Sequence, residues 1–158
     1  MAEKTRAYAV RVDIDASLDR VWAALSSTAA LERWMSPGTR MAAQIGGLFS
    51  GSLDRVKPFA ARIDIYDAPR RIRLVHLPPE EMPAFDGIVV DDILVERREP
   101  QTVVRVLGEG FPRSDGYSDF YVGRQMGWRQ SLARLKVYLE KHMDFAPAKS
   151  QTAKGDWS

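Results

Sequence analysis

The stretch "GWRQSLARLKVYLEK", from Gly127 to Lys141, decides the fold of this chain. Its apolar residues follow one another at intervals of four, three and four positions, the spacing of one face of an α-helix, and they are Trp128, Leu132, Leu135 and Leu139. Arginine, lysine and glutamate side chains fall mostly on the other face. Continued back to 116 and on to 142, the pattern predicts a helix about 40 Å long. Such a helix needs a broad apolar surface to lie against.

The preceding residues supply that surface as strands. Apolar and polar residues alternate over 8–14, which is typical of a half-buried strand. Two short helical segments follow, at 18–25 and 29–34, and then three pairs of alternating runs predict three hairpins. The hairpin turns are expected at Gly46-Gly47, at 67–70 and at 99–101.

This order of elements predicts an α+β domain. Hairpins give an antiparallel sheet, and one face of such a sheet has to be covered. The long C-terminal helix can cover it, because it is long enough to cross most of a curved sheet. We expect one domain over residues 1–145. The polar stretch "APAKSQTAKGDWS", residues 146–158, is expected to be a flexible tail.

Composition excludes several classes of function. The chain has 158 residues, of which 45% are hydrophobic and 28% charged, as in an ordinary globular domain. A formal net charge of +2, with scattered basic residues, argues against a nucleic-acid partner. The absence of cysteine excludes disulfides and thiolate chemistry, and two histidines without paired spacing predict no zinc site. No apolar run approaches the roughly 20 residues that span a membrane, and no signal peptide is recognisable, so we expect a cytoplasmic protein without a cofactor.

Several segments, in this order, resemble the START-like (SRPBCC) helix-grip superfamily. They are "VRVDIDASLDRVWAAL", "LERWMSP", "DAPRRIRL", "TVVRV" and "GWRQSLARLKVYLE", and the resemblance covers about residues 8–142. Within the superfamily, the chain is most similar to bacterial single-domain relatives of the activator of the heat-shock-protein-90 ATPase. The resemblance implies a curved seven-stranded sheet that grips the C-terminal helix, with a cavity between them. Many relatives bind apolar or amphipathic small molecules there, and others, including polyketide cyclases, carry out chemistry.

Three ionisable residues are candidates for chemistry inside this fold. His76 and Asp91 stand at strand spacing from apolar neighbours, so their side chains are predicted to point inward. Arg124 lies one helical turn before Trp128. Because an unpaired buried charge is costly, these groups either pair within the core or mark the polar end of a cavity. In the second case, His76 with an acid partner is a candidate general base.

The expected cavity wall is apolar and aromatic. Beside His76 and Arg124, the candidate ligand-binding residues are Trp34, Met35, Phe49, Phe59, Ile65, Leu74, Met82, Phe85, Tyr117, Phe120, Tyr121 and Trp128. The proline-rich connection 77–87 is interpreted either as a cover over the pocket mouth, with Trp34 and Met35 at the same rim, or as packing on the sheet edge. Gly123 and Gly127 indicate either close approach of helix and sheet or room for a ligand.

Three functions follow, and the sequence leaves all three open. The first is a carrier or sensor that binds a small apolar or aromatic ligand under the long helix. The second is a cyclase-like or hydrolase-like enzyme that uses His76, Asp91 and Arg124. The third is a protein-interaction module. A chaperone partner is the least favoured, because the eukaryotic activator has an additional N-terminal domain, whereas a homodimer stays open, since an exposed strand edge can pair two subunits.

Overall fold

The computed structural model describes residues 4–53, 58–77, 83 and 85–145, which contain a seven-stranded antiparallel sheet. The strands lie side by side in the order β1-β7-β6-β5-β4-β3-β2. Their bounds are Thr5–Ile14 (β1), Arg40–Met41 (β2), Leu48–Gly51 (β3), Phe59–Asp67 (β4), Arg71–Leu77 (β5), Val90–Arg98 (β6) and Gln101–Pro112 (β7). The predicted α+β helix-grip class and the antiparallel sheet are confirmed.

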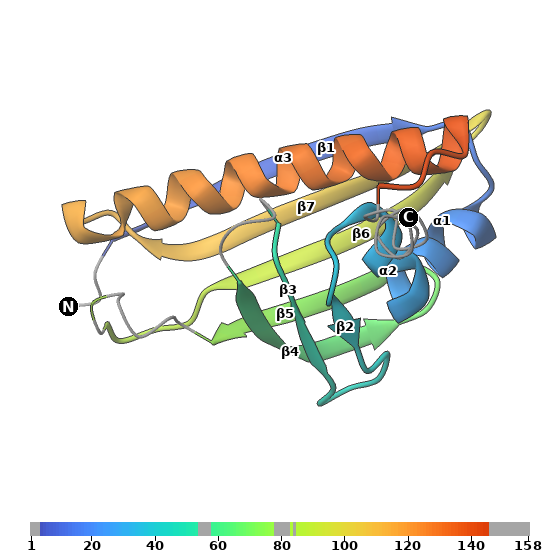
Figure 1. Cartoon of the computed structure of the whole chain (residues 1–158). Coiled ribbons are helices and arrows are strands. Elements are labelled where there is room, and N and C mark those ends of the chain that lie inside the picture. The colour runs from blue at the N-terminus through green and yellow to red at the C-terminus, as the bar shows by residue number, and fades with distance from the viewer. Residues whose placement is uncertain (1–3, 54–57, 78–82, 84, 146–158) are drawn as a thin grey trace, which may run out of the picture.

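The helices lie along one side of this sheet. They are α1 (Leu18–Ser26), α2 (Thr28–Trp34), the 3₁₀ turn η1 (Asp115–Tyr117) and α3 (Ser118–Lys141). The hydroxyls of Ser17 and Ser27 cap α1 and α2, since each accepts a hydrogen bond from a backbone N–H of the first turn. Figure 1 shows α3 running along the sheet beside β1 and β7, with α1 and α2 at the end where α3 terminates.

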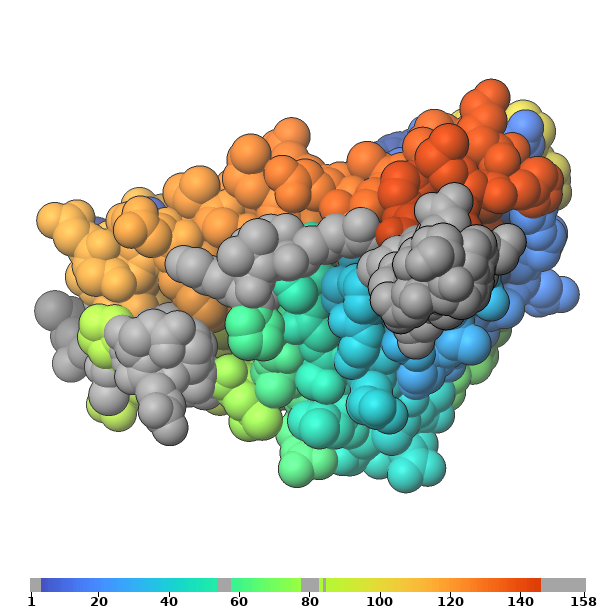
Figure 2. All heavy atoms as spheres, in the orientation of Figure 1, coloured from blue at the N-terminus to red at the C-terminus, as the bar shows by residue number. Residues whose placement is uncertain are grey.

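The second half of α3 lies on a closed hydrophobic core. The four apolar residues of its inner face are at most 5% exposed, and they are Trp128, Leu132, Leu135 and Leu139. They belong to one cluster with inward residues of the sheet, among them Val104 and Val106. Burying one such side chain contributes about 1.5–3 kcal/mol, so this face is sufficient to hold α3 on the sheet. In the space-filling view, α3 in orange and red borders one side of the molecule (Figure 2).

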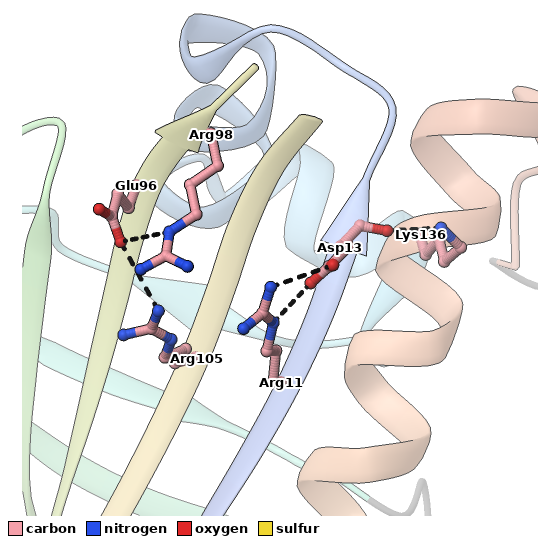
Figure 3. Close-up of polar contacts among 6 residues, drawn as sticks. All are labelled: Arg11, Asp13, Glu96, Arg98, Arg105 and Lys136. Atoms are coloured by element: carbon pink, nitrogen blue, oxygen red, sulfur yellow. Dashed lines mark hydrogen bonds and ion pairs between the residues drawn. The ribbon is translucent and has the colours of Figure 1, made fainter. Parts of the chain in front are cut away.

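The outer face of the sheet carries paired charges instead. Arg11 and Asp13 of β1 lie 2.7 Å apart, and Glu96 of β6 lies 3.3 Å from Arg98 and 3.7 Å from Arg105 of β7. Figure 3 shows these side chains across β1, β7 and β6. We refer to Arg11, Asp13, Glu96, Arg98 and Arg105 as the outer charge ladder.

The predicted hairpin at Gly46-Gly47 is wrong in its boundaries. Strand β2 ends at Met41, so residues 42–47 form the connection to β3. The two glycines bond to β4 instead: the N–H of Gly46 donates to the carbonyl of Ile63 at 2.7 Å, and the N–H of Ile63 donates to the carbonyl of Gly47 at 2.9 Å. A Cβ at Gly47 would lie 2.0 Å from the carbonyl oxygen of Ala42, so only glycine fits there.

A β-bulge in β4 overturns the prediction for Ile65. Ile63 pairs with Leu74, but Ile65 pairs with Arg73, so one extra residue is accommodated between them. Ile65 therefore lies opposite Arg73 on the outer face, and it does not line the inner face as strict alternation predicted. An extra residue reverses the alternation of every following side chain.

Candidate functional site

A buried carboxylate lies on the inner face of the sheet. Asp91 of β6 is 0% exposed. The hydroxyl of Tyr8 lies 2.5 Å from Oδ1, while Nε2 of His76 and Nε1 of Trp128 lie 2.5 Å and 3.0 Å from Oδ2. Because a carboxylate only accepts hydrogen bonds, all three groups are donors. We call Tyr8, His76, Asp91 and Trp128 the Asp91 cluster; it joins β1, β5, β6 and α3.

His76 has one nitrogen that this cluster does not use. The residue is 5% exposed, and its backbone N–H donates to the carbonyl of Val89 at 2.9 Å, which fixes its place in the sheet. Its ring meets Phe59 of β4 edge-on, with the ring centres 6.0 Å apart. Nδ1 is buried and has no hydrogen-bond partner among the residues that the structure describes. Buried polar atoms are nearly always bonded, so this nitrogen needs an explanation.

Arg124 brings a positive charge to the same place. It precedes Trp128 by one helical turn and is 8% exposed. Its guanidinium carbon lies 5.3 Å from the centre of the Phe59 ring and 5.1 Å from the centre of the Phe120 ring. Cation–π contacts of this kind stabilise a guanidinium group that has left bulk water. Arg124 and His76 thus contact the same ring, that of Phe59.

The surroundings determine the protonation states of the cluster. Burial lowers the pKa of His76, and the charge of Arg124 lowers it further, so the imidazole is neutral at pH 7. Burial raises the pKa of Asp91, but its interaction and hydrogen bond with His76 and the charge of Arg124 outweigh burial and leave that pKa below its ordinary value. Burial and the Asp91 charge raise the pKa of Tyr8, so its hydroxyl keeps its proton. A neutral His76 that donates from Nε2 presents a lone pair on Nδ1.

A glycine inside β7 makes room for the cluster. Gly108 lies opposite Tyr8 in one neighbouring strand and opposite Asp91 in the other. A Cβ at this position would lie 2.3 Å from Cζ of Tyr8 and 2.7 Å from Oδ1 of Asp91. Sequence reasoning missed Tyr8 as a partner of Asp91. The glycine within the strand was the signal that indicates such a close approach.

The structure brings together the three residues that the sequence singled out for chemistry. His76, Asp91 and Arg124 are all buried and lie on the inner side of the sheet and helix. Phe59 and Phe120, two of the predicted wall residues, contact Arg124 directly. Three further wall residues, Phe49, Leu74 and Tyr121, pack in or against the core nearby.

Trp34 and Met35 lie elsewhere in the core. Both are wholly buried, and Nε1 of Trp34 donates to the carbonyl of Ala24 on α1 at 2.9 Å. Arg134 of α3 donates to the backbone carbonyls of Trp34 and Met35 at 3.0 Å and 3.3 Å. These two residues therefore join α1, α2 and α3, and they do not reach the exposed rim that the sequence suggested.

The structure describes the connection 77–87 only at 77, 83 and 85–87. Phe85 is half-buried, and its ring meets Tyr117 of η1 edge-on at 5.2 Å between ring centres. This contact places the end of the connection against the start of α3. Met82 lies outside the described residues, so its role as a ligand contact stays a prediction.

The two glycines of α3 have different surroundings. A Cβ at Gly127 would lie 2.8 Å from Cβ of Leu53, so Gly127 permits close approach between α3 and the segment after β3. A Cβ at Gly123 would meet nothing within 4 Å, and this residue is exposed. The close-approach interpretation therefore holds for Gly127, while Gly123 faces away from the core.

A separate groove lies at the other end of the molecule, between α1, α2 and the last turns of α3. Its volume is about 560 Å³, and it is lined by Arg20, Ala23, Ala24, Ser27, Ala30, Arg33, Tyr138, Leu139, His142 and Asp144. Both arginines are engaged within the chain: Arg20 donates to the carbonyl of Leu139 at 3.0 Å, and Arg33 pairs with Asp144 at 2.5 Å. The groove therefore lacks the orphaned polar atom that distinguishes the Asp91 cluster.

Two other kinds of site receive no support from the part of the chain that the structure describes. In it, no three His, Cys, Asp or Glu side chains are gathered so that they could hold a metal ion. None of its helices is long and apolar enough to cross a membrane.

Comparison with protein families assigns the chain. A sequence model of the family described as "Activator of Hsp90 ATPase homolog 1-like protein" matches residues 15–140. The chain belongs to this family. The match includes His76, Asp91 and Arg124 of this family member, but Tyr8 lies before its first residue. A comparison with curated proteins gives no match.

Solved structures with the same fold include proteins from several bacteria. A protein of Mesorhizobium loti is 21% identical, with a TM-score of 0.73 over 86% of this chain and 98% of that one. Aha1 of Colwellia psychrerythraea, described as a dimer, is 20% identical, with a TM-score of 0.69 over 85% and 96%. CalU16 of Micromonospora echinospora is 16% identical, with a TM-score of 0.68 over 96% and 83%. At these identities, the likeness establishes the helix-grip fold of this Hsp90-activator-like protein and does not show what, if anything, it binds.

Proposed function

We propose that this protein binds a small apolar or aromatic molecule between the inner face of the sheet and the N-terminal half of α3. Support comes from His76, Asp91 and Arg124, which are gathered at one place beside the rings of Phe59 and Phe120. Ionisable side chains are seldom fully buried unless they are paired. Sites for small ligands combine apolar walls with a few placed polar groups, and this region has both.

The observation that carries the proposal is the unused Nδ1 of His76. A buried acceptor or donor left without a partner costs about 1–3 kcal/mol. Within the cluster, Tyr8 and Trp128 donate to Asp91 as His76 does, so Nδ1 is the polar side-chain atom of the cluster that is left unbonded among the described residues. A bound molecule supplies the missing partner of Nδ1.

The test is an NMR titration of the full chain with 2-naphthol, a neutral aromatic probe whose hydroxyl can donate a hydrogen bond. We expect saturable shifts at Phe59, His76, Phe120 and Arg124. The Phe120→Ala variant should bind more weakly, because it removes a ring beside Arg124, whereas Val122→Ala, on the exposed side of the same helix, should bind as the wild type does. Absence of binding, or shifts confined to the groove between α1, α2 and α3, contradicts the proposal.

A second candidate function is catalysis by proton transfer, of a cyclase-like or hydrolase-like kind. It is favoured by one observation: a neutral imidazole is oriented by a buried carboxylate, with its other nitrogen unused. This is the arrangement of a general base and its orienting acid. Turnover of a bound compound that disappears in His76→Gln, while binding persists, supports it. Binding without turnover leaves the carrier or sensor function.

Self-association is a further proposal. Aha1 of Colwellia psychrerythraea is described as a dimer and shares this fold. Sedimentation equilibrium of the full chain tests whether this protein also forms a homodimer. A single species at the monomer mass of 17.8 kDa excludes it under the conditions used.

A further inference from the structure

The hydrogen bonds of Asp91 fix which way His76 is protonated. Tyr8, His76 and Trp128 all direct polar atoms at the carboxylate, and Asp91 accepts from each of them. Nε2 of His76 therefore carries a proton. A second proton on Nδ1 would give a buried imidazolium ion; burial and the charge of Arg124 disfavour it more than Asp91 favours it, so the pKa of His76 is lowered. Nδ1 is thus an acceptor that lacks a donor.

The surrounding charges restrict what can donate to this nitrogen. A ligand ammonium group would be repelled by the positive charge of Arg124. A ligand carboxylate has no hydrogen to donate, and it would be repelled by the lone pair of Nδ1 and by the charge of Asp91. A neutral hydroxyl avoids both conflicts, because it donates one hydrogen while its oxygen keeps lone pairs that the guanidinium attracts. The rings of Phe59 and Phe120 beside these groups favour an aromatic body.

We infer that the ligand of this site is an aromatic or conjugated molecule with a phenolic or enolic hydroxyl group, which donates a hydrogen bond to Nδ1 of His76. The inference rests on the proposed function, since it names the ligand class of the same site. It assigns a specificity role to His76: Asp91 holds the imidazole in one tautomer, and the imidazole selects ligands that can donate. Sites built to bond a hydroxyl reject analogues without one far more strongly than apolar pockets reject a missing methylene.

The test compares 2-naphthol with its methyl ether, 2-methoxynaphthalene, on the full chain. The two probes share the ring system, and only 2-naphthol can donate. We expect 2-naphthol to bind at least about tenfold more tightly, and the ¹⁵N resonance of Nδ1 of His76 to move on binding of 2-naphthol but not of the ether. Equal affinity for the two probes, or an unmoved Nδ1 resonance, overturns the inference.

Two variants keep the test independent of folding. In His76→Gln, the amide nitrogen can still donate to Asp91, as Nε2 does, but no acceptor occupies the position of Nδ1. The ratio of the affinity for 2-naphthol to that for 2-methoxynaphthalene should therefore fall to about one. In His142→Asn, at an exposed residue after α3, the ratio should stay as in the wild type. A preference that persists in His76→Gln overturns the inference. If 2-methoxynaphthalene binds at this site as tightly as 2-naphthol, the inference is overturned and the proposed function stands. If neither probe binds, both the inference and the proposed function are contradicted.

Discussion

The two faces of β6 hold their charges in opposite ways. On the inner face, Asp91 is fully buried and accepts hydrogen bonds from three buried side chains. On the outer face, Glu96 is 54% exposed and lies beside Arg98 and Arg105 in the outer charge ladder (Figure 3). Water replaces a lost partner in the ladder but not in the cluster. Removing the carboxylate of Asp91 on the inner face should therefore lower the free energy of unfolding much more than removing that of Glu96 on the outer face.

The largest effect is expected from Asp91→Ala. The substitution leaves three buried donors without an acceptor, so the free energy of unfolding should fall by about 3–5 kcal/mol. Urea unfolding measures it, with Glu96→Gln on the outer face as the matched control; the control should lose less than about 1 kcal/mol. A small loss for Asp91→Ala, comparable with that of the control, would show that the two faces do not differ as described.

A smaller effect is expected from Gly108→Ala. The added Cβ meets Tyr8 and Asp91 at distances that force one of them to move, so stability should fall by about 1–3 kcal/mol, and the near-ultraviolet circular dichroism of the buried tyrosine should change. Gly123→Ala is the control, since its Cβ meets nothing and alanine favours the helix by up to about 1 kcal/mol. If both substitutions stabilise the protein, the close contact in the cluster is not as tight as the structure indicates.

The pH dependence of stability should come from the inner face. The pKa of His76 is lowered in the folded state, so below pH 6.5 the unfolded chain binds a proton that the folded chain does not. Stability is therefore fully present above pH 6.5 and declines as the pH falls towards the folded pKa, by up to about 1.4 kcal/mol per pH unit. The lowered pKa of Asp91 adds a further loss when the pH falls below its unfolded value of 3.8.

Unfolding midpoints between pH 5 and 7 check this expectation. His76→Gln should flatten the profile in that range relative to the wild type. A profile that is equally steep in His76→Gln assigns the pH dependence to other groups.

The smallest effect is expected from salt. Pairs in the outer charge ladder are exposed and screened, so raising sodium chloride from 0.05 to 1 M, where the Debye length falls to about 3 Å, should remove whatever they contribute. The difference between wild type and Glu96→Gln should vanish at high salt, while the loss in Asp91→Ala persists. Urea midpoints at both salt concentrations measure this, and a salt-sensitive loss in Asp91→Ala would contradict the burial of Asp91.

Local periodicity predicted most of the elements but not every boundary. The interval pattern of α3 and the alternation of β1 and β5 agree with the structure, because each element buries one face and its sequence repeats accordingly. The turn at Gly46-Gly47 and the face of Ile65 were wrong for a shared reason. Gly46 and Gly47 both form backbone hydrogen bonds with Ile63, at the β-bulge of β4. Because these bonds come from another segment of the chain, the alternation of residues within β4 does not indicate the bulge.

The candidate site was predicted in part. His76, Asp91 and Arg124 stood out because charged or polar residues occupied positions that periodicity assigned to the core. Asp91 was ambiguous beside Asp92, which faces outward and pairs with Arg71 and Arg73 at 2.9 Å each. The bond from Tyr8 to Asp91 depends on β1 and β6 both flanking β7, which no local pattern of β1 or β6 encodes.

The sequence by itself determined which residues are inside wherever an element is regular. A repeat of two or of about 3.6 positions sorts side chains between core and solvent, since each element must bury its apolar face. Only the tertiary structure decided which of the inner residues meet. Tyr8, His76, Asp91 and Trp128 come from four elements, and their convergence on one carboxylate follows from the strand order, the room left by Gly108 and the position of α3. Contacts between side chains that are far apart in the chain depend on how the elements pack, and that packing involves the whole sheet and the helix together.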